Sequence, residues 1–214
     1  MVKRGKFIVI DGINGCGKDT IAKMMADYIF TKNKTAHLFI TREPYISKYS
    51  SEILTMLKDG KDAYANAEIL SDLFIKDRKT HLVWIEKELS AGHHVICSRY
   101  KYSMLAYQRT QGMPLYKLLK MHEGMLVPDL IIIPDVSVEE TIRRIAMDKH
   151  KTFQEVFSKD KLFQEKLKNN YLDLPKQIPD ENIVILTGET SSEIFQKAKI
   201  EIDKIMHEHN AALF

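Results

Sequence analysis

The sequence has little cysteine and no long hydrophobic run. Only two of its 214 residues are cysteines, Cys16 and Cys97, which excludes a disulfide framework and favours a reducing compartment. The apolar run nearest the N-terminus, Phe7–Ile10, is four residues long and ends at Asp11. A secretory signal needs about 7–15 apolar residues and a membrane-spanning helix about 20. We therefore expect a cytoplasmic protein that has no membrane partner.

An excess of one charge is also missing. Lysine and arginine number 32 against 29 aspartates and glutamates, which gives a formal net charge of +3. A polynucleotide partner requires a basic face, so we expect no nucleic-acid partner. The content of 44% hydrophobic and 29% charged residues is typical of a globular protein and excludes a disordered or fibrous chain. No repeat, linker or low-complexity segment is visible, and we predict a single domain over residues 1–214.

Five short apolar runs are predicted to form strands. Their residues are apolar in succession rather than in alternation, as expected for strands covered on both faces. Helical patterns lie between them, within residues 21–29 and over residues 67–90, 138–147, 153–171 and 191–206. This alternation predicts an α/β fold in three layers, a five-stranded parallel sheet flanked by helices, with ligands at the carboxyl ends of the strands. The predicted strands are Phe7–Ile10, His37–Thr41, His94–Ser98, Leu130–Ile133 and Ile183–Leu186.

A glycine-rich segment follows the first predicted strand and leads into a predicted helix. Glycines let backbone N–H groups surround phosphate oxygens, and a helix N-terminus adds partial positive charge. Lys18 would then reach the β- and γ-phosphates of a nucleoside triphosphate. The alternative is an ordinary glycine-rich turn between a strand and a helix. The residues expected to hold ATP here are Gly12, Ile13, Asn14, Gly15, Cys16, Gly17, Lys18, Asp19 and Thr20.

The position after Lys18 departs from the strict phosphate-loop pattern. That pattern has serine or threonine after the lysine to hold Mg²⁺, whereas this chain has Asp19 followed by Thr20. The threonine one place later resembles the phosphate loop of nucleoside monophosphate kinases more than that of GTPases. We therefore expect a P-loop kinase fold with a short lid.

Three further segments resemble the thymidylate kinase family. They are the turn Thr41–Pro44, the helical segment Leu73–His81 and the segment Ser98–Gln108, which follows the third predicted strand. The resemblance extends from the first strand to about Gly188. It implies transfer of the γ-phosphoryl group of Mg·ATP to dTMP, giving dTDP, and a homodimer. The residues that it assigns to the acceptor are Asn14, Arg42, Pro44, Phe74, Arg78, Arg99, Ser103, Met104, Tyr107 and Gln108.

The spacing of Phe74 and Arg78 agrees with that assignment. Residues four apart project from the same face of a helix. The resemblance implies that Phe74 stacks on a pyrimidine, that Arg78 donates to its carbonyl and that Tyr107 packs under the deoxyribose. The alternative for Arg78 is a structural ion pair with a carboxylate such as Asp77.

Basic residues are expected to close over the triphosphate. The resemblance places a lid at about residues 143–157, where Arg144 and then Lys149 would neutralise charge on the transferred group. A solvated basic helix end is the alternative. Lys18, Arg99 and Arg144 are thus the expected catalytic residues.

Two departures from the family pattern bear on the metal and the base. The family has aspartate where this chain has Ser98, and Asp19 adds a carboxylate nearby. We hypothesise that Asp19 anchors Mg²⁺, with Asp11 as a further candidate. Met104 replaces a small polar residue that would read the base, which relaxes base choice in principle.

Two other functions remain open at this point. A deoxynucleoside kinase would need a carboxylate base, and Glu43 is placed for that role. A catalytically impaired ATP-binding regulator would account for the departures at Ser98 and Asp19.

Overall fold

One parallel sheet runs through the described part of the chain. The computed structural model describes residues 3–148, 157 and 160–211, with side chains as far as Met206. Neighbouring strands pair in the order β2-β3-β1-β4-β5, and every pair is parallel. The strands β2 and β3 therefore lie on one side of β1, and the strands β4 and β5 lie on the other. This arrangement creates a topological switch point beside β1. The strands are β1 (Phe7–Ile10), β2 (Leu38–Arg42), β3 (His94–Ser98), β4 (Leu130–Asp135) and β5 (Ile183–Thr187).

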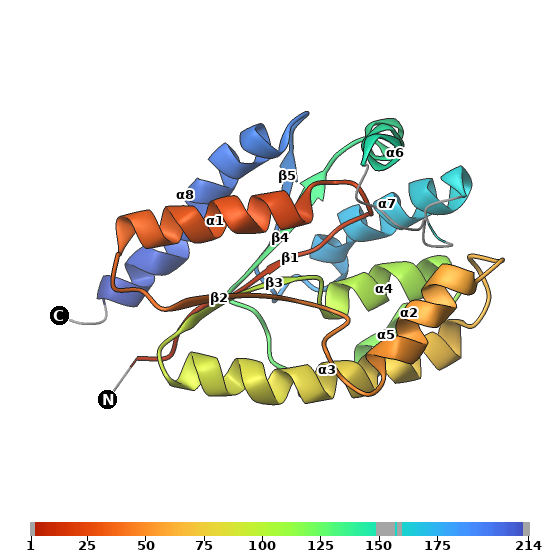
Figure 1. Ribbon diagram of the computed structural model, residues 1–214, viewed down its shortest axis with the longest axis horizontal. Helices are drawn as coiled ribbons and strands as arrows, with labels where there is room; N and C mark the ends of the chain where they lie inside the picture. Colours follow the sequence, from red (N-terminus) through yellow and green to blue (C-terminus); the bar gives the residue numbers. More distant parts are fainter. Residues whose placement is uncertain (1–2, 149–156, 158–159, 212–214) are drawn as a thin grey trace.

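Helices cover both faces of this sheet. Figure 1 shows α1 and α8 on one side of the sheet and α3 on the other, and α7 contacts β4 and β5. The predicted three-layer α/β fold is confirmed. The helices are α1 (Lys18–Lys32), α2 (Ser50–Asp59), α3 (Ala67–Ser90), α4 (Lys101–Thr110), α5 (Leu115–Met121), α6 (Val138–Met147), α7 (Lys161–Gln177) and α8 (Ser191–Ala211).

The helices differ in how well the sequence predicted them. Both α3 and α6 have the predicted bounds, and α8 begins at the predicted residue. The prediction for residues 153–171 is only partly met, because the described helix α7 is Lys161–Gln177 and residues 153–156 lie outside the described part. No helical prediction was made for α2, α4 or α5. Residues of α2 and α4 line the smaller cavity described below, and α5 packs against α4.

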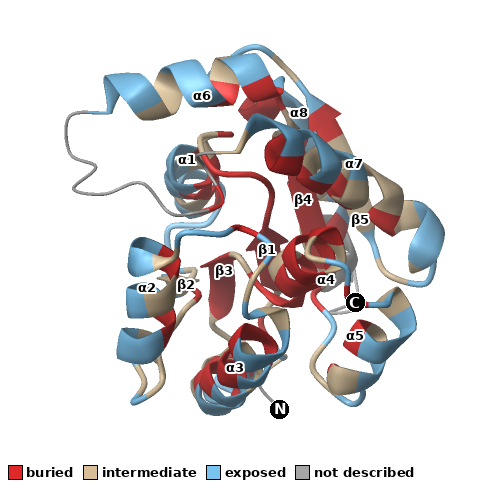
Figure 2. Cartoon of the chain, turned by 90° about the vertical axis from the view of Figure 1, so that its right-hand side faces the viewer, coloured by how far each residue is buried: buried red, intermediate tan, exposed pale blue. Residues whose placement is uncertain are grey.

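The core is centred on β1, β3 and β4, which are almost wholly buried (Figure 2). The prediction that the second and fifth strands are also buried on both faces is wrong. Both are edge strands, and Phe39 and Ile40 of β2 remain 37% and 49% exposed. A run of apolar residues does not distinguish a central strand from an edge strand, because both contact the core on at least one face.

No described helix is long and apolar enough to cross a membrane. The carboxyl ends of β1, β3 and β4 lie at one edge of the sheet and lead into Asp11, Arg99 and Val136. Every segment singled out by the sequence for phosphate or acceptor binding follows one of these ends or packs next to it.

Candidate active site

Two adjoining cavities open at the carboxyl edge of the sheet. The larger one, about 1270 Å³, is bounded by the phosphate loop, α6 and the loop between β5 and α8. The smaller one, about 370 Å³, lies among α2, α3 and α4. Arg42 and Arg99 line both cavities, so these two cations stand where the cavities meet.

Lys18 is held inside the phosphate loop. Its Nζ donates to the carbonyl oxygens of Gly12 at 3.0 Å and Ile13 at 2.7 Å, and it lies 3.6 Å from the Sγ of Cys16. Burial, followed by the nearby charge of Arg99, lowers the pKa of Lys18. The loop therefore holds the Lys18 ammonium group beside the larger cavity through hydrogen bonds to backbone carbonyl oxygens. A phosphate oxygen can replace these carbonyl oxygens as the acceptor.

The start of α1 faces the larger cavity. Gly17 adopts a left-handed conformation with φ +93° immediately before the helix, and Lys18, Asp19 and Thr20 of its first turn line the cavity. Asn14, Gly15 and Gly17 line it as well, whereas Gly12, Ile13 and Cys16 support the loop from behind. Free backbone N–H groups at such a terminus favour an anion.

Helix α6 brings Arg144 to the opposite wall of the larger cavity. Its Nε donates to Glu140 at 2.7 Å, and its NH2 atom donates to the carbonyl oxygen of Glu189 at 2.5 Å. Glu140 also holds Arg143, and these two hydrogen bonds lower the pKa of Glu140 to about 2. These two contacts hold Arg144 at the wall of the larger cavity. The predicted lid lies only partly within the described residues, and Lys149 lies outside them.

Asp19 and Ser98 meet across the floor of the larger cavity. The hydroxyl of Ser98 donates to Oδ1 of Asp19 at 2.8 Å, and Arg42 lies 3.9 Å from the other carboxylate oxygen. Partial desolvation opposes ionisation, but the hydrogen bond from Ser98 and the neighbouring cations outweigh it and lower the pKa of Asp19. Asp19 therefore presents an ionised carboxylate to the cavity. An exposed carboxylate of this kind suits a hard cation such as Mg²⁺.

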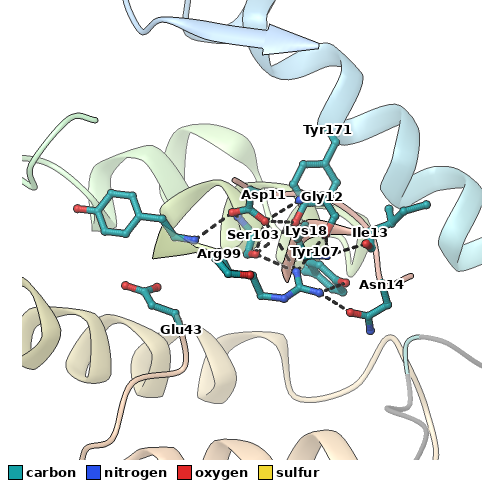
Figure 3. Close-up of polar contacts among 12 residues, drawn as sticks. Asp11, Gly12, Ile13, Asn14, Lys18, Glu43, Arg99, Ser103, Tyr107 and Tyr171 are labelled. Carbon is teal, nitrogen blue, oxygen red and sulfur yellow. Dashed lines mark hydrogen bonds and ion pairs between the residues drawn. The ribbon is translucent and has the colours of Figure 1, made fainter. Parts of the chain in front are cut away.

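Asp11, the second metal candidate, is engaged differently. Its carboxylate is fully buried and lines neither cavity. It accepts hydrogen bonds from the N–H groups of Gly12, Tyr100 and Ser103 and from the hydroxyls of Ser103 and Tyr171 (Figure 3). Five donors occupy its oxygens, so Asp11 connects the end of β1 to α4 and α7. These hydrogen bonds leave its carboxylate poorly placed to bind a metal in either cavity.

Arg99 projects from the end of β3 into the space between the two cavities. It has φ +70°, an uncommon conformation for a residue with a side chain. Its guanidinium donates to the Gly12 carbonyl at 3.2 Å, the Ser103 hydroxyl at 3.1 Å and Oδ1 of Asn14, and it lies over the Tyr107 ring (Figure 3). Asn14 itself lines the larger cavity. Its hydrogen bond to Arg99 connects it with the smaller cavity, which Arg99 also lines.

The smaller cavity contains nine of the ten residues expected at the acceptor; Asn14 is the exception. Its walls are largely apolar, with Phe74, Met104 and Tyr107 joined by Leu54, Leu57 and Phe157, which the sequence did not single out. Such a slot fits a flat base with a sugar below it. The residues from the prediction that line it are Arg42, Pro44, Phe74, Arg78, Arg99, Ser103, Met104, Tyr107 and Gln108.

Arg78 is fixed by two buried partners. Its NH2 atom lies 2.6 Å from Glu43, and its NH1 atom lies 2.7 Å from Nε2 of His122. The alternative of a structural ion pair is met, but its carboxylate is Glu43 rather than Asp77, which accepts instead from Tyr45 and Ser47. Adjacent residues on a helix face different directions, which separates the two side chains.

Glu43 and His122 were not predicted in these roles. Both oxygens of Glu43 are engaged, one by Arg78 and the other by His81 at 3.5 Å, so its position does not favour a general base. Burial, and then the charge of Arg78, lowers the pKa of His122 to about 3. The neutral ring lies 2.7 Å from the Leu118 carbonyl through Nδ1, which makes Nε2 the acceptor for Arg78. No local pattern in the sequence pairs residues 44 positions apart.

Comparisons with known proteins agree with this geometry. The family model described as thymidylate kinase matches residues 10–198. A probable thymidylate kinase from Pyrococcus horikoshii is 38% identical over 187 residues, covering 85% of this chain and 88% of the relative. Another from Methanococcus maripaludis is 36% identical over 169 residues, covering 79% and 77%.

The fold has a solved counterpart in the thymidylate kinase of Candida albicans. The TM-score is 0.72 at 23% sequence identity, covering 94% of this chain and 93% of that one, which establishes likeness of fold. Together with the family match over most of the chain, the relatives show that this protein is a phosphotransferase of the thymidylate kinase family.

Proposed function

We propose that this protein transfers the γ-phosphoryl group of Mg·ATP to dTMP and releases dTDP and ADP. The observation that carries the proposal is the pair of cavities that share Arg42 and Arg99. One cavity is bounded by the phosphate loop, and the other is a smaller, largely apolar cavity that Arg78 also lines. Two nucleotides bound in them would meet phosphate to phosphate at the shared arginines.

The reaction needs charge neutralisation more than proton transfer. A phosphate oxygen of dTMP is already ionised at neutral pH, and it bonds to the γ-phosphorus as the bond to the β–γ bridging oxygen breaks. Lys18 and Arg144 would offset charge on the donor, and Arg99 would bind the acceptor phosphate. Holding the acceptor phosphate in line with the γ-phosphate would also accelerate the transfer.

The acceptor assignment follows the walls of the smaller cavity. Phe74 would stack on the base, Tyr107 would pack under the deoxyribose, and Arg78 would donate to a base carbonyl. Met104 has no N–H or O–H to donate, and its sulfur lies 4.0 Å from the NH1 atom of Arg78, so Gln108 is the remaining polar side chain near the base edge. Ser103, Pro44 and Arg42 complete the site around the sugar and phosphate.

The function is tested by acceptor-dependent ADP release. Wild type should use dTMP and not thymidine, because thymidine lacks the phosphate that Arg99 would bind. Lys18→Met should lower turnover by at least about a thousandfold while the protein keeps its circular dichroism spectrum. Turnover of thymidine in preference to dTMP, or full activity of Lys18→Met, would reject the proposal.

We assign the metal anchor to Asp19. Asp19 would hold Mg²⁺, which would neutralise charge on the triphosphate. Ser98 holds the Asp19 carboxylate by a 2.8 Å hydrogen bond. Asp19→Ser should raise the Mg²⁺ concentration required for half-maximal activity, and adding Ser98→Asp to that variant should lower it again. An unchanged requirement in Asp19→Ser would remove Asp19 from the metal site.

We also propose a homodimer, as the family resemblance implies. Exposed apolar side chains on β2 and α3, among them Ile40 and Val83, support self-association. Sedimentation velocity should give twice the mass of the chain. Ile40→Lys and Val83→Lys, made separately, should show which exposed side chain lies in the contact, because the variant at the contact should have the lower dimer fraction.

A further inference from the structure

Gln108 carries a buried oxygen for which the described part of the protein supplies no hydrogen-bond partner. The side chain is 1% exposed and lines the smaller cavity, yet its Oε1 accepts no hydrogen bond from the described residues. A buried acceptor without a donor costs about 1–3 kcal/mol. Because Gln108 lines the smaller cavity, a donor on a ligand bound there would satisfy this oxygen.

The orientation of the Gln108 amide is set by a second glutamine. Gln111, just past the end of α4, donates through Nε2 to the carbonyl oxygens of Ala63 at 2.9 Å and Ala65 at 2.8 Å. Two carbonyl partners require that this atom be the NH₂ group. The remaining atom of the Gln111 amide is therefore an acceptor, and the Nε2 of Gln108 donates to it at 3.1 Å.

These hydrogen bonds, from Gln108 to Gln111 and from Gln111 to the carbonyl oxygens of Ala63 and Ala65, form a chain that we call the relay. The loop carbonyls determine which way the Gln111 amide faces, and Gln111 determines which way the Gln108 amide faces. The two glutamines are three residues apart at the end of one helix, so their side chains can meet. Turning the Gln108 amide over would place its NH₂ in the cavity and set two oxygens against each other at Gln111.

We propose that Gln111 is a positioning residue that determines base choice by holding the carbonyl oxygen of Gln108 toward the acceptor base. The inference rests on the proposed function. The acceptor base must then present an N–H beside a carbonyl, the carbonyl facing Arg78. Thymine and uracil do so at N3 and C4, whereas N3 of cytosine is itself an acceptor and would oppose the Gln108 oxygen.

Two substitutions separate the relay from a merely structural role. Gln111→Lys keeps a donor for the carbonyls of Ala63 and Ala65 but removes the acceptor for Gln108. Gln111→Glu keeps that acceptor and removes the donor. If Gln111 only tethers the loop, Gln111→Lys should change the preference for dTMP little and Gln111→Glu should change it more. If Gln111 orients Gln108, Gln111→Lys should weaken the preference and Gln111→Glu should keep it. The substrates are dTMP and the monophosphate of 5-methyldeoxycytidine, which have similar shapes.

The measurement is kcat/KM for both substrates in wild type and both variants. In Gln111→Lys we expect the preference for dTMP to fall by about tenfold, mainly through a higher KM for dTMP, as for the loss of one hydrogen bond. Gln111→Glu should keep the preference within about twofold despite a lower melting temperature. Gln111→Leu replaces the lysine variant if that protein does not fold.

An unchanged preference in Gln111→Lys or Gln111→Leu, or an equal loss in Gln111→Glu, would overturn the relay. These results differ from failure of the proposed function, in which wild type itself would not phosphorylate dTMP.

Discussion

Two buried partners fix the orientation of the Arg78 side chain. Its guanidinium is 1% exposed and is held by a carboxylate on one side and a neutral imidazole on the other. A buried arginine needs an anion to balance its charge, and Glu43 supplies it. His122 adds no charge, so it fixes direction without weakening the positive character of the side chain. Five donors on a rigid fork leave N–H groups for a ligand.

His122 gives a prediction at this scale. His122→Leu leaves the NH1 atom of Arg78 without its 2.7 Å acceptor, and the arginine is then free to turn from the base. We expect KM for dTMP to rise by about tenfold with little change in kcat, in line with the cost of one buried unpaired donor. Steady-state kinetics with saturating ATP measure this change.

The matched control is His122→Gln, because a glutamine oxygen can accept from Arg78. It should recover most of the wild-type KM. If the leucine and glutamine variants have equal kinetics, hydrogen bonding by His122 does not position Arg78.

At the scale of elements, the phosphate loop depends on its contact with α6. A Cβ atom added to Gly15 would lie 2.6 Å from the carbonyl oxygen of Thr141, and Gly15 has φ +82°. Gly15→Ala should therefore push the loop away from α6 and from Arg144. We expect KM for ATP to rise severalfold and the melting temperature to fall by several degrees.

Gly124→Ala separates the clash from the backbone strain. Gly124 has φ +74°, close to that of Gly15, but a Cβ atom there meets nothing within 4 Å. Its alanine variant should lose about 1 kcal/mol of stability and keep its KM for ATP. An equal rise in KM in both variants would refute the claim that α6 holds the loop in place.

The sequence predicted elements better than it predicted their partners. Local spacing specified α3 and α6 to their end residues, because apolar periodicity acts within one element. It could not show that β2 lies at an edge, since edge position depends on strand order. It also did not identify the partners of Arg78, because Glu43 and His122 reach that side chain from other elements. The relay at Gln111 involves loop carbonyls, which no side-chain pattern reports.

At the scale of the whole molecule, the net charge of +3 is an average over unequal parts. Six basic residues line the larger cavity, Lys18, Arg42, Arg99, Arg143, Arg144 and Lys168, together with five acidic ones, Asp19, Asp135, Glu140, Asp148 and Glu189. The low overall charge argues against a polynucleotide surface, whereas basic side chains gathered at one cavity suit a single triphosphate. The parallel sheet produces this concentration, because the segments that carry these residues follow strand ends at one edge or pack beside that edge.

The stability of the folded chain should fall in mild acid, and His122 accounts for part of that loss. Burial lowers its pKa to about 3, assisted by the charges of Arg78 and Lys101 and opposed by the hydrogen bond to Leu118. Between pH 6.5 and pH 3 the unfolded chain therefore binds a proton here that the folded chain does not. The free energy of unfolding then falls as pH is lowered, by up to about 1.4 kcal/mol per pH unit.

Asp129 changes stability in the same direction at lower pH. Desolvation opposes its ionisation, but the N–H of Phe7 and the cations Arg4 and Lys6 outweigh it and lower its pKa, so its contribution is lost as pH falls below about 4. The two residues separate on the pH axis. Urea unfolding of wild type and His122→Gln between pH 7 and pH 5 isolates His122 by difference. The free energy of unfolding should depend less steeply on pH in His122→Gln, by the equivalent of up to one proton. Parallel curves for wild type and variant would mean that His122 takes up its proton inside the fold, and Arg78 would then lose its acceptor in mild acid without unfolding.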